Sequence, residues 1–137
     1  TKPYPIIDHG LQTINYQIVP HKGDWKEAGI LRLAWELNEP AFGHLEFSHP
    51  GKLGTSSEFM KVNRDNVLAS VLKKPEDEKG IVVRVYETCG KKTEFELFLP
   101  YFSKSWKLKI NPCEIKTFLI ESHKNWEIKE VNLLEEK

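Results

Sequence analysis

Apolar and polar residues alternate along much of this chain, and that pattern predicts β-strands. In residues 11–19 one parity is apolar, and it consists of Ile14, Tyr16 and Ile18. Successive side chains of a strand point to opposite faces of a sheet, so we expect this segment to be a strand with one buried face. The pattern predicts a second, shorter strand over 42–47, where Leu45 and Phe47 share a face.

The second half of the chain predicts short strands with turns at regular intervals, which is typical of an antiparallel sandwich. The expected strands cover 59–62, 67–73, 81–87, 95–99, 106–110, 115–120 and 126–133. Residues 115–120 are more continuously apolar, which indicates a central strand covered on both faces. In the last strand Trp126 and Ile128 share one parity, while Val131 and Leu133 share the other. A β-bulge between Ile128 and Val131 is expected to reconcile the two.

One segment differs, because residues 24–38 carry the signals of an α-helix. Asp24 follows a glycine and can accept backbone N–H groups of the first turn, and Glu27 stands three residues later, as in a capping box. Pro40 ends the pattern. A broad apolar face is expected to lie on a sheet, and it consists of Trp25, Ala28, Leu31, Leu33, Trp35 and Leu37.

These patterns predict a mainly β protein, an antiparallel β-sandwich with one helix near 24–38. Residues 48–57 are rich in glycine, proline and serine, and they are the best candidate for an internal boundary. We therefore expect a first domain over 1–56, which contains the helix, and a small antiparallel sandwich over 57–137. A chain of 137 residues is long enough to bury a core without disulfides or metals.

Charge and cysteine content argue against several classes of protein. Lys and Arg together number 20, as do Asp and Glu, so there is no electrostatic case for binding nucleic acid or an anionic membrane. No apolar run approaches the roughly 18 residues of a transmembrane helix. The two cysteines, Cys89 and Cys113, are too few for a disulfide framework and fit a cytoplasmic location, or merely buried thiols.

The histidines are the first candidates for a metal site, and they are His9, His21, His44, His49 and His123. No pair of them stands at a metal-ligand spacing, the cysteines form no CxxC motif, and a zinc site needs three or four converging ligands. Surface or capping histidines are therefore expected, and no metal site in this chain. Acidic pairs such as Glu135 and Glu136 are expected to be solvated, because a tail does not maintain a raised pKa.

Four blocks of the sequence resemble one known family. They include Ile7-Asp8-His9-Gly10 with His21-Lys22-Gly23-Asp24, then Val83-Arg84-Val85-Tyr86-Glu87, then Glu114-Ile115-Lys116-Thr117, and last Asn132-Leu133-Leu134-Glu135. Together they are similar to the C-terminal half of the family 38 glycoside hydrolases, the α-mannosidases, and they cover most of the chain. The last two blocks stand in the reverse of the order that the resemblance implies.

The resemblance implies that residues 1–56 finish a large sandwich of the galactose-mutarotase type and that 57–137 form an Ig-like sandwich. It also implies a parent enzyme that hydrolyses α-mannosidic bonds with retention, using a carboxylate nucleophile, a carboxyl acid/base and a zinc ion that holds the sugar. In the family these groups come from a catalytic domain near the N-terminus, which nothing in this sequence matches. We therefore expect no catalytic or metal-binding residue in this chain, which starts with Thr and is interpreted as a fragment.

Two places are candidates for contact with the substrate or with the catalytic domain. His21 and Asp24 lie in a loop at the expected helix N-terminus, whose free N–H groups favour oxygen-rich ligands; capping alone is the alternative. Arg84 shares a predicted strand face with apolar residues, and an unpaired buried charge is costly, so an ion pair with Glu87 or Glu94 is expected. A role of Arg84 and Glu87 at the substrate or at a domain interface is the alternative.

The function expected is that of a non-catalytic C-terminal domain that braces the catalytic domain of an α-mannosidase and lends loops to the edge of its glycan site. The expected partners are that domain, a mannose-containing glycan reached through the parent, and a second copy of the chain, because exposed apolar strands favour dimers. A free-standing carbohydrate-binding module is the alternative, for which Trp126 is the tryptophan least committed to the core. An Ig-like interaction module without a sugar ligand is a third possibility.

Overall fold

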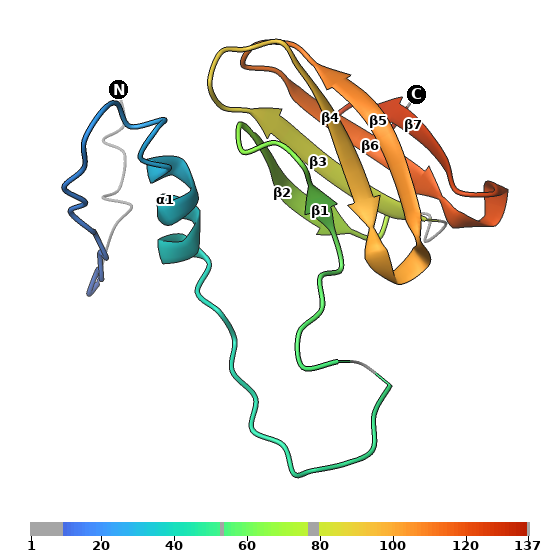
Figure 1. Ribbon diagram of the computed structural model, residues 1–137, viewed down its shortest axis with the longest axis horizontal. Coiled ribbons are helices and arrows are strands. Elements are labelled where there is room, and N and C mark those ends of the chain that lie inside the picture. The colour runs from blue at the N-terminus through green and yellow to red at the C-terminus, as the bar shows by residue number, and fades with distance from the viewer. Residues whose placement is uncertain (1–9, 53, 77–79, 137) are drawn as a thin grey trace, which may run out of the picture. The chain divides into compact units, whose positions relative to one another are not determined.

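The computed structural model describes residues 10–52, 54–76 and 80–136, and Figure 1 shows their course. Ile7, Asp8 and His9 of the first block lie outside these residues. The chain divides into two compact units, Thr1–His49 and Pro50–Lys137. Within the described residues the first unit holds the α-helix and the second holds the strands.

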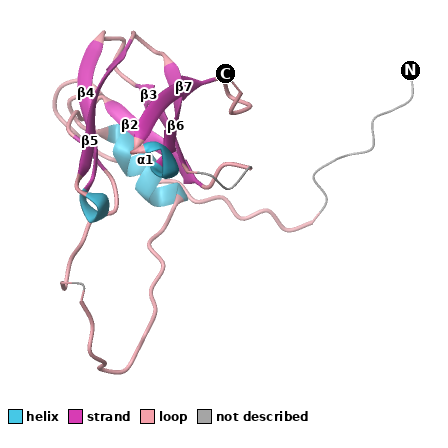
Figure 2. Cartoon of the chain, turned by 90° about the vertical axis from the view of Figure 1, so that its right-hand side faces the viewer, coloured by secondary structure: helices cyan, strands magenta, loops and turns pink. Residues whose placement is uncertain are grey.

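The second unit is a sandwich of two antiparallel sheets (Figure 2). A three-stranded sheet has the order β1-β4-β5, formed by Lys61–Val62, Thr93–Leu99 and Lys104–Ile110. A four-stranded sheet has the order β2-β3-β6-β7, formed by Val67–Lys73, Ile81–Glu87, Ile115–Glu121 and Glu127–Val131. Short 3₁₀ turns connect β4 to β5 and β6 to β7, and they are Pro100–Phe102 and Ser122–Lys124. The predicted mainly β antiparallel sandwich with one helix is confirmed.

The core lies between the two sheets, where the inward positions of the strands are aliphatic. The most deeply buried of these side chains are at most 1% exposed, and they include Leu97, Leu99, Ile110, Val83, Val85 and Ile120. Full burial of one such side chain contributes roughly 1.5–3 kcal/mol. This shared core therefore holds the two sheets together.

The strand β6 lies in the middle of its sheet, between β3 and β7, as its apolar run predicts. Its register with β7 runs without a break from Glu121, opposite Glu127, to Thr117, opposite Val131. The predicted bulge between Ile128 and Val131 is therefore wrong. The change of parity arises because both faces of this sheet are covered, so that Ile128 packs on the core while Val131, 8% exposed, lies on the outer face.

A bulge does occur in the same sheet, but on a different strand. The register between β2 and β3 shifts between Ala69 and Val71, which leaves Ser70 as the extra residue. The strand β2 lies at the edge of the four-stranded sheet. Bulges are common on edge strands because an extra residue there disturbs pairing with only one neighbour.

The helix α1 is shorter than predicted and covers Ile30–Asn38 rather than 24–38. Gly29 precedes it with a φ of 64°, in the left-handed region. A left-handed residue cannot belong to a right-handed helix, so the regular helix starts only after Gly29. None of the residues of α1 is buried, and the expectation that its apolar face lies on a sheet stays a prediction. No helix in the described ranges is long and apolar enough to cross a membrane.

The two strands predicted in the first unit do not occur in the described structure. Residues 11–19 and 42–47 pair with no strand there. Their apolar side chains face solvent, with Ile14 and Ile18 each 81% exposed and Leu45 97% exposed. A strand needs a neighbour for its backbone N–H and C=O groups, and the described residues supply none to these segments. The completion of a larger sandwich by residues 1–56 stays a prediction.

Candidate functional site

The Asp24 loop is a closed turn that precedes the helix. The Asp24 carboxylate oxygen Oδ1 accepts the backbone N–H groups of Lys26 at 2.8 Å and of Glu27 at 2.9 Å, as the capping box predicts. The Glu27 carboxylate folds back over Gly23, where it would overlap a Cβ atom at that position. His21 is exposed in the same loop. The loop is therefore shaped by its own hydrogen bonds, and its contact with a substrate or a catalytic domain stays a prediction.

Arg84 lies on the outer face of the four-stranded sheet, and its guanidinium group bonds to neutral oxygen atoms. Its Nε donates a hydrogen bond to Thr117 Oγ1 at 3.0 Å. One of its terminal nitrogen atoms donates to the Leu133 carbonyl oxygen, also at 3.0 Å. These two bonds fix the planar guanidinium between β6 and the C-terminal tail. Arg84 thereby fastens the tail to the sheet.

The ion pair predicted for Arg84 is wrong for both of its expected partners. Glu87 stands three residues later on the same strand, so its side chain points to the opposite face of the sheet. Glu94 belongs to the other sheet, where its carboxylate pairs with Lys109 at 2.8 Å. A charged side chain in mid-strand has thus been satisfied by a hydroxyl group and a carbonyl group instead of by a carboxylate.

The C-terminal tail, residues 132–136, closes over the outer face of the four-stranded sheet. Asn132 shapes it, because its Oδ1 accepts two backbone N–H groups farther along the tail, at 2.8 and 3.0 Å. Lys73 on β2 forms an ion pair with Glu135. Beneath the tail, Val82 and Thr117 are at most 2% exposed. The sheet is therefore covered by the core on one face and by this tail on part of the other.

A small pocket lies beside the tail. Its volume is about 200 Å³, and it is lined by Pro75, Glu76, Leu119, Leu134 and Glu135. Ligand pockets in proteins typically measure roughly 300–1,000 Å³ and bring several polar groups together. This one is smaller and carries two carboxylates beside three apolar residues, so it does not define a binding site.

Glu87 ends β3 as a buried carboxylate, 3% exposed. Its Oε1 accepts hydrogen bonds from the Cys89 N–H and the Asn66 side-chain amide, both at 2.8 Å. Its Oε2 accepts three backbone N–H groups, from Gly90 at 2.7 Å, Lys91 at 3.1 Å and Cys113 at 2.9 Å. The carboxylate thus joins the β3–β4 turn to the β5–β6 turn and to the segment that precedes β2.

The hydrogen bonds to Glu87 decide its ionisation. Burial acts to raise its pKa, but the bonds from the Cys113 N–H, the Asn66 amide and the adjoining turn stabilise the charged form more strongly. They hold the pKa at about 2, against an ordinary value of 4.5. A carboxylate that stays ionised and is occupied by backbone donors is a poor general acid at neutral pH. Glu87 is an anchor for three loops, and its place at a domain interface stays a prediction.

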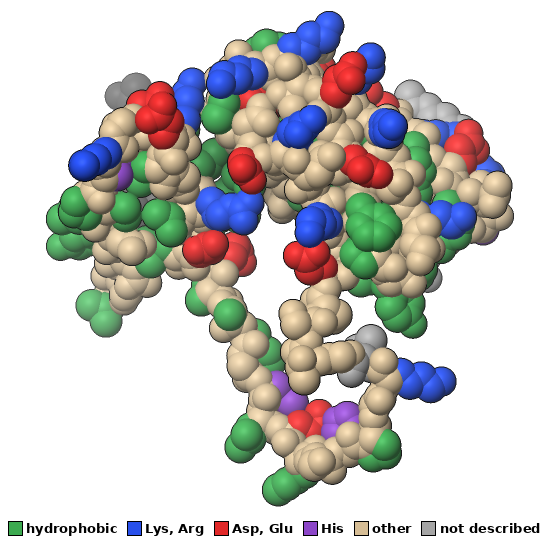
Figure 3. Space-filling model, viewed as in Figure 1, with side chains coloured by type: hydrophobic (Ala, Val, Ile, Leu, Met, Phe, Trp, Pro, Cys, Tyr) green, Lys and Arg blue, Asp and Glu red, His purple; other side chains and the backbone are tan. Residues whose placement is uncertain are grey.

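Mixed charge covers the outer face of the three-stranded sheet. Glu94 lies opposite Lys109 and Glu96 opposite Lys107 across the β4–β5 pair. Figure 3 shows basic and acidic side chains side by side over this sandwich. Since neighbouring charges of opposite sign cancel at a distance, this face does not present a field of one sign.

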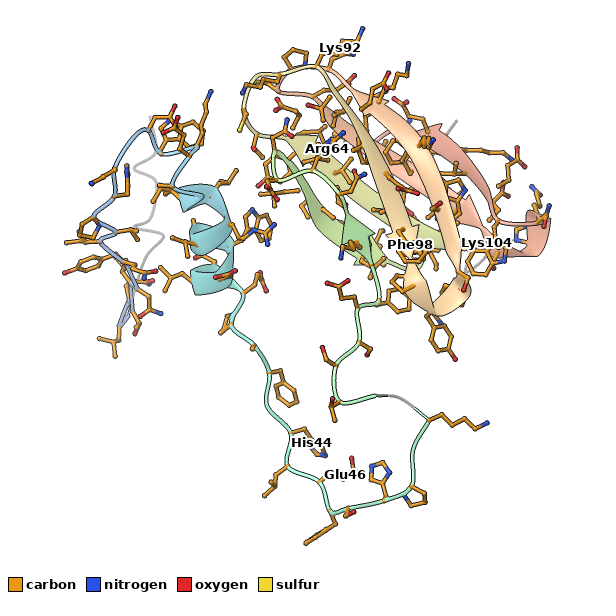
Figure 4. The ribbon with its side chains drawn as sticks, in the orientation of Figure 1. His44, Glu46, Arg64, Lys92, Phe98 and Lys104 are labelled. Carbon is orange, nitrogen blue, oxygen red and sulfur yellow. The ribbon has the colours of Figure 1, made fainter. Side chains whose placement is uncertain are left out.

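Metal ligands do not converge in the described residues, where no group of three His, Cys, Asp or Glu side chains could hold an ion. His44 and Glu46 lie on the extended segment after α1 (Figure 4), and Glu46 is 3.7 Å from His49. His123 is 3.8 Å from Glu121. Each of these histidine–carboxylate contacts is a pair, and a structural zinc site needs four ligands. The residues that the structure describes therefore do not converge into a site for the family's zinc ion.

Comparison with known proteins assigns the sandwich to a family. Residues 66–106, which run from the start of β2 into β5, match the model of the glycosyl hydrolases family 38 C-terminal beta sandwich domain. Alpha-mannosidase G of Dictyostelium discoideum is 31% identical over 140 residues, which cover 85% of this chain. The chain belongs to the C-terminal β-sandwich region of glycoside hydrolase family 38. The resemblance inferred from the four blocks is confirmed.

Two mammalian proteins are also similar to this family 38 chain. Alpha-mannosidase 2C1 of Mus musculus is 32% identical over 91 residues, or 64% of the chain, and that of Homo sapiens is 29% identical over 100 residues, or 71% of the chain. The chain spans only 13% of the length of the Dictyostelium protein and 9% of each mammalian one. No solved structure gives a significant match.

The predicted site residues of the family 38 chain fall into two units. His21 and Asp24 belong to the first, while Arg84 and Glu87 belong to the second and face opposite sides of β3. The spacing of three residues between Arg84 and Glu87 is itself a signal of opposite faces, because strand side chains alternate. Their partners, Thr117 and the Leu133 carbonyl for Arg84, and Asn66 and Cys113 for Glu87, depend on register between distant segments. The sequence carries no local signal of that register.

Proposed function

We propose that this chain is a non-catalytic C-terminal part of an α-mannosidase, where it braces the catalytic domain and borders the glycan site. Three observations support the proposal. The relatives are α-mannosidases of far greater length. The buried carboxylate of the sandwich, Glu87, is bound by backbone N–H groups and has a low pKa. The sandwich buries an apolar core, whereas the preceding segment leaves a set of apolar side chains exposed.

The observation that carries the proposal is the exposed apolar face of the first unit. Residues 11–19 alternate like a strand with one buried face, yet Tyr16 and Ile18 are 82% and 81% exposed. An exposed apolar surface of this kind marks an interaction site, and an unpaired extended segment readily adds to the edge of a sheet. We propose that this face is covered by strands of a larger sandwich in the parent enzyme.

The hydrolytic chemistry belongs, in this proposal, to the catalytic domain of the parent. There a carboxylate nucleophile, a carboxyl acid/base and a zinc ion that holds the sugar carry out retaining hydrolysis of the α-mannosidic bond. The residues of this chain position that domain and bind no zinc. Cys89 and Cys113 are not joined in a disulfide, which supports a reducing compartment such as the cytoplasm.

Reconstitution in trans tests the proposal. An α-mannosidase of this family is prepared without the region aligned with this chain, and the chain is then added to it. We expect the chain alone to leave an aryl α-mannoside intact, and the mixture to regain activity and thermal stability. Tyr16→Asp and Ile18→Asp should weaken this reconstitution, because each places a charge on the face that pairs. Asn15→Asp and Gln17→Glu, on the opposite parity, are the matched controls.

Two results would overturn this function. The first is hydrolysis of the mannoside by the chain alone. The second is equal reconstitution by all four variants, which would show that the apolar face of residues 11–19 does not dock on the parent.

The same face predicts association when the parent is absent. Two copies can cover each other's exposed apolar segments, so we expect a dimer whose population rises with concentration. Light scattering across a concentration series measures it, and Ile18→Asp should shift the equilibrium towards monomer. A strict monomer at high concentration would contradict this expectation.

A further inference from the structure

Aromatic rings from three connecting segments gather at one end of the sandwich. They are Phe59, Tyr101, Phe102 and Trp126, called the aromatic cluster below. Figure 1 shows the β4–β5 and β6–β7 connections, which carry the last three, at the same end. Phe102 lies at the centre, with ring centroids 5.9 Å from Phe59, 5.0 Å from Tyr101 and 4.4 Å from Trp126. Phe59 and Tyr101 stand nearly perpendicular to it, at 86° and 88°.

The backbone that carries these rings is held in an unusual conformation. Ser103, Asn125 and Trp126 lie in the left-handed region, with φ values of 51°, 53° and 64°. A bulky residue such as tryptophan is rare there, and such conformations persist where the surrounding structure fixes them, often at binding sites. The Trp126 carbonyl oxygen is fixed by the Trp106 indole N–H, which donates to it at 3.1 Å. The cluster is therefore presented on a rigid, pre-formed frame.

Only half of the aromatic cluster serves the core. Phe102 and Trp126 pack against the buried core residues, whereas Tyr101 is 70% exposed and Phe59 is 46% exposed. The T-shaped contact with Phe102 fixes the orientation of the Tyr101 ring while most of that side chain stays in solvent. Tyr101 thus exposes to solvent an aromatic ring of fixed orientation that ends in a hydroxyl group. This combination is typical of side chains that bind at interfaces which are partly apolar and partly wet.

The charges beside the aromatic cluster balance each other. The Glu121 carboxylate, at the end of β6, lies 2.7 Å from the Lys124 ammonium group and 2.5 Å from that of Lys129. The Lys129 ammonium group also lies 3.3 Å from the Glu127 carboxylate. These two carboxylates and two ammonium groups neutralise one another, and Lys104, which follows the β4–β5 turn, adds a single positive charge. The surface therefore fits a neutral ligand that has one apolar face and several hydroxyl groups.

We propose that the aromatic cluster is a sugar-binding platform on which Tyr101, supported by Phe102 and Trp126, stacks a pyranose ring. The C–H groups on one face of a pyranose carry partial positive charge and pack against the negative face of an aromatic ring. The sugar hydroxyl groups remain free to bond with water and with the polar turns that flank the cluster. The platform stands on this geometry, whereas the choice of mannose as the sugar rests on the function proposed above. A single stacked ring supports weak binding, suited to holding one branch of a glycan.

Titration of the full chain with mannobiose, followed by NMR, tests the platform. We expect saturable shifts at the Trp126 indole N–H and at the amides of residues 101–103. Tyr101→Ala should weaken binding by about tenfold, the effect of one lost aromatic contact, and Tyr101→Phe should retain most of the affinity. Phe42→Ala is the matched control, because it removes another exposed aromatic ring, 93% exposed, from the first unit. It should leave the affinity unchanged.

The outcomes separate the platform from the function proposed above. Absence of saturable binding, or equal losses in Tyr101→Ala and Phe42→Ala, overturns the platform and leaves the bracing role intact. If cellobiose binds as tightly as mannobiose, the result supports stacking of a pyranose ring and contradicts only the choice of mannose as the sugar. Unchanged amide shifts of buried residues such as Leu97 in Tyr101→Ala verify that the variant keeps the fold.

Discussion

The two units of this chain carry similar alternating patterns and reach opposite results. In the second unit the apolar parity of β4 is buried, and Leu97 is 0% exposed, because β4 lies between two strands and faces a second sheet. In the first unit the apolar parity of residues 11–19 is in solvent, and Ile18 is 81% exposed. Alternation therefore specifies which face of a strand is to be buried, while burial itself requires a partner strand.

The sharpest test of this contrast compares two leucines. Leu97→Ala removes a fully buried side chain and should lower the free energy of unfolding of the second unit by about 2–5 kcal/mol. Leu45→Ala removes a side chain that is 97% exposed in the first unit and should change it by less than about 0.5 kcal/mol. Urea unfolding measures both. Similar losses for the two variants would contradict the division between a packed unit and an unpartnered one.

Glu87→Gln should be the next largest effect. The amide cannot accept the four backbone N–H groups as the carboxylate does, and one of its own N–H groups would face those donors. The depression of the Glu87 pKa from 4.5 to about 2 corresponds to about 3 kcal/mol of stability at neutral pH. Glu94→Gln, at the exposed pair with Lys109, is the control and should have little effect. A thermal midpoint equally unaffected in both variants would show that the anchor is dispensable.

The same carboxylate predicts how the second unit responds to acid. Since the folded pKa of Glu87 lies below its unfolded value of 4.5, its stabilisation is complete above pH 4.5 and is lost as the pH falls towards about 2. The pKa of Glu121 is also lowered to about 2, by hydrogen bonds from Lys124 and Lys129, so it acts in the same range and direction. Thermal midpoints measured across this range should fall steeply in the wild type. They should fall less in Glu87→Gln, and an unchanged slope would contradict the assignment.

Thr117→Val should have a smaller effect on the same unit. The substitution keeps the shape of the side chain and removes the oxygen that accepts the Arg84 Nε hydrogen bond. Loss of a partner for a partly buried cation costs roughly 1–2 kcal/mol. Thr55→Val, at an exposed position, is the matched control. If both variants unfold at the same urea concentration, the tail is held by its other contacts.

Asp24→Ala should have the smallest effect, and it should be confined to the first unit. Loss of the bonds to the Lys26 and Glu27 N–H groups should cost roughly 0.5–1 kcal/mol locally. Hydrogen exchange at those two amides should accelerate, while the unfolding of the sandwich stays unchanged. A lower thermal midpoint of the sandwich would show that the two units are coupled.

Much of the sandwich could be predicted from its sequence, because its strands are local patterns. The positions of β2, β3 and β6 follow from runs such as Val67 to Lys73, and the central place of β6 follows from an apolar run that only a two-sided cover explains. The predictions that were wrong depend on strand register or on backbone conformation. The bulge sits at Ser70 instead of near Ile128, and Gly29 delays the helix through a left-handed φ of 64°.

The candidate site was predictable only in part. The acceptance of backbone N–H groups by Asp24 follows from its place just before the helical pattern, with Glu27 three residues later. The partners of Arg84 and Glu87 come from β6, the tail and two turns, so they depend on register that no single segment encodes. The face on which Glu87 lies could nevertheless be predicted, because strand alternation places it on the same side as Val83 and Val85. A carboxylate on that buried side requires hydrogen-bond donors.

The extra residue in β2 also affects how this chain aggregates. A bulge twists the open margin of a sheet and interrupts the ladder that a foreign strand would join. One of the two edge strands of the other sheet, β5, carries Lys104, Lys107 and Lys109, whose charges repel a growing stack of like molecules. Fibrillar growth from the sandwich is therefore opposed at two of its four edge strands, and the other two are β1, which is only two residues long, and β7, which carries Glu127, Lys129 and Glu130. Precipitation of the isolated polypeptide should therefore begin in its N-terminal third.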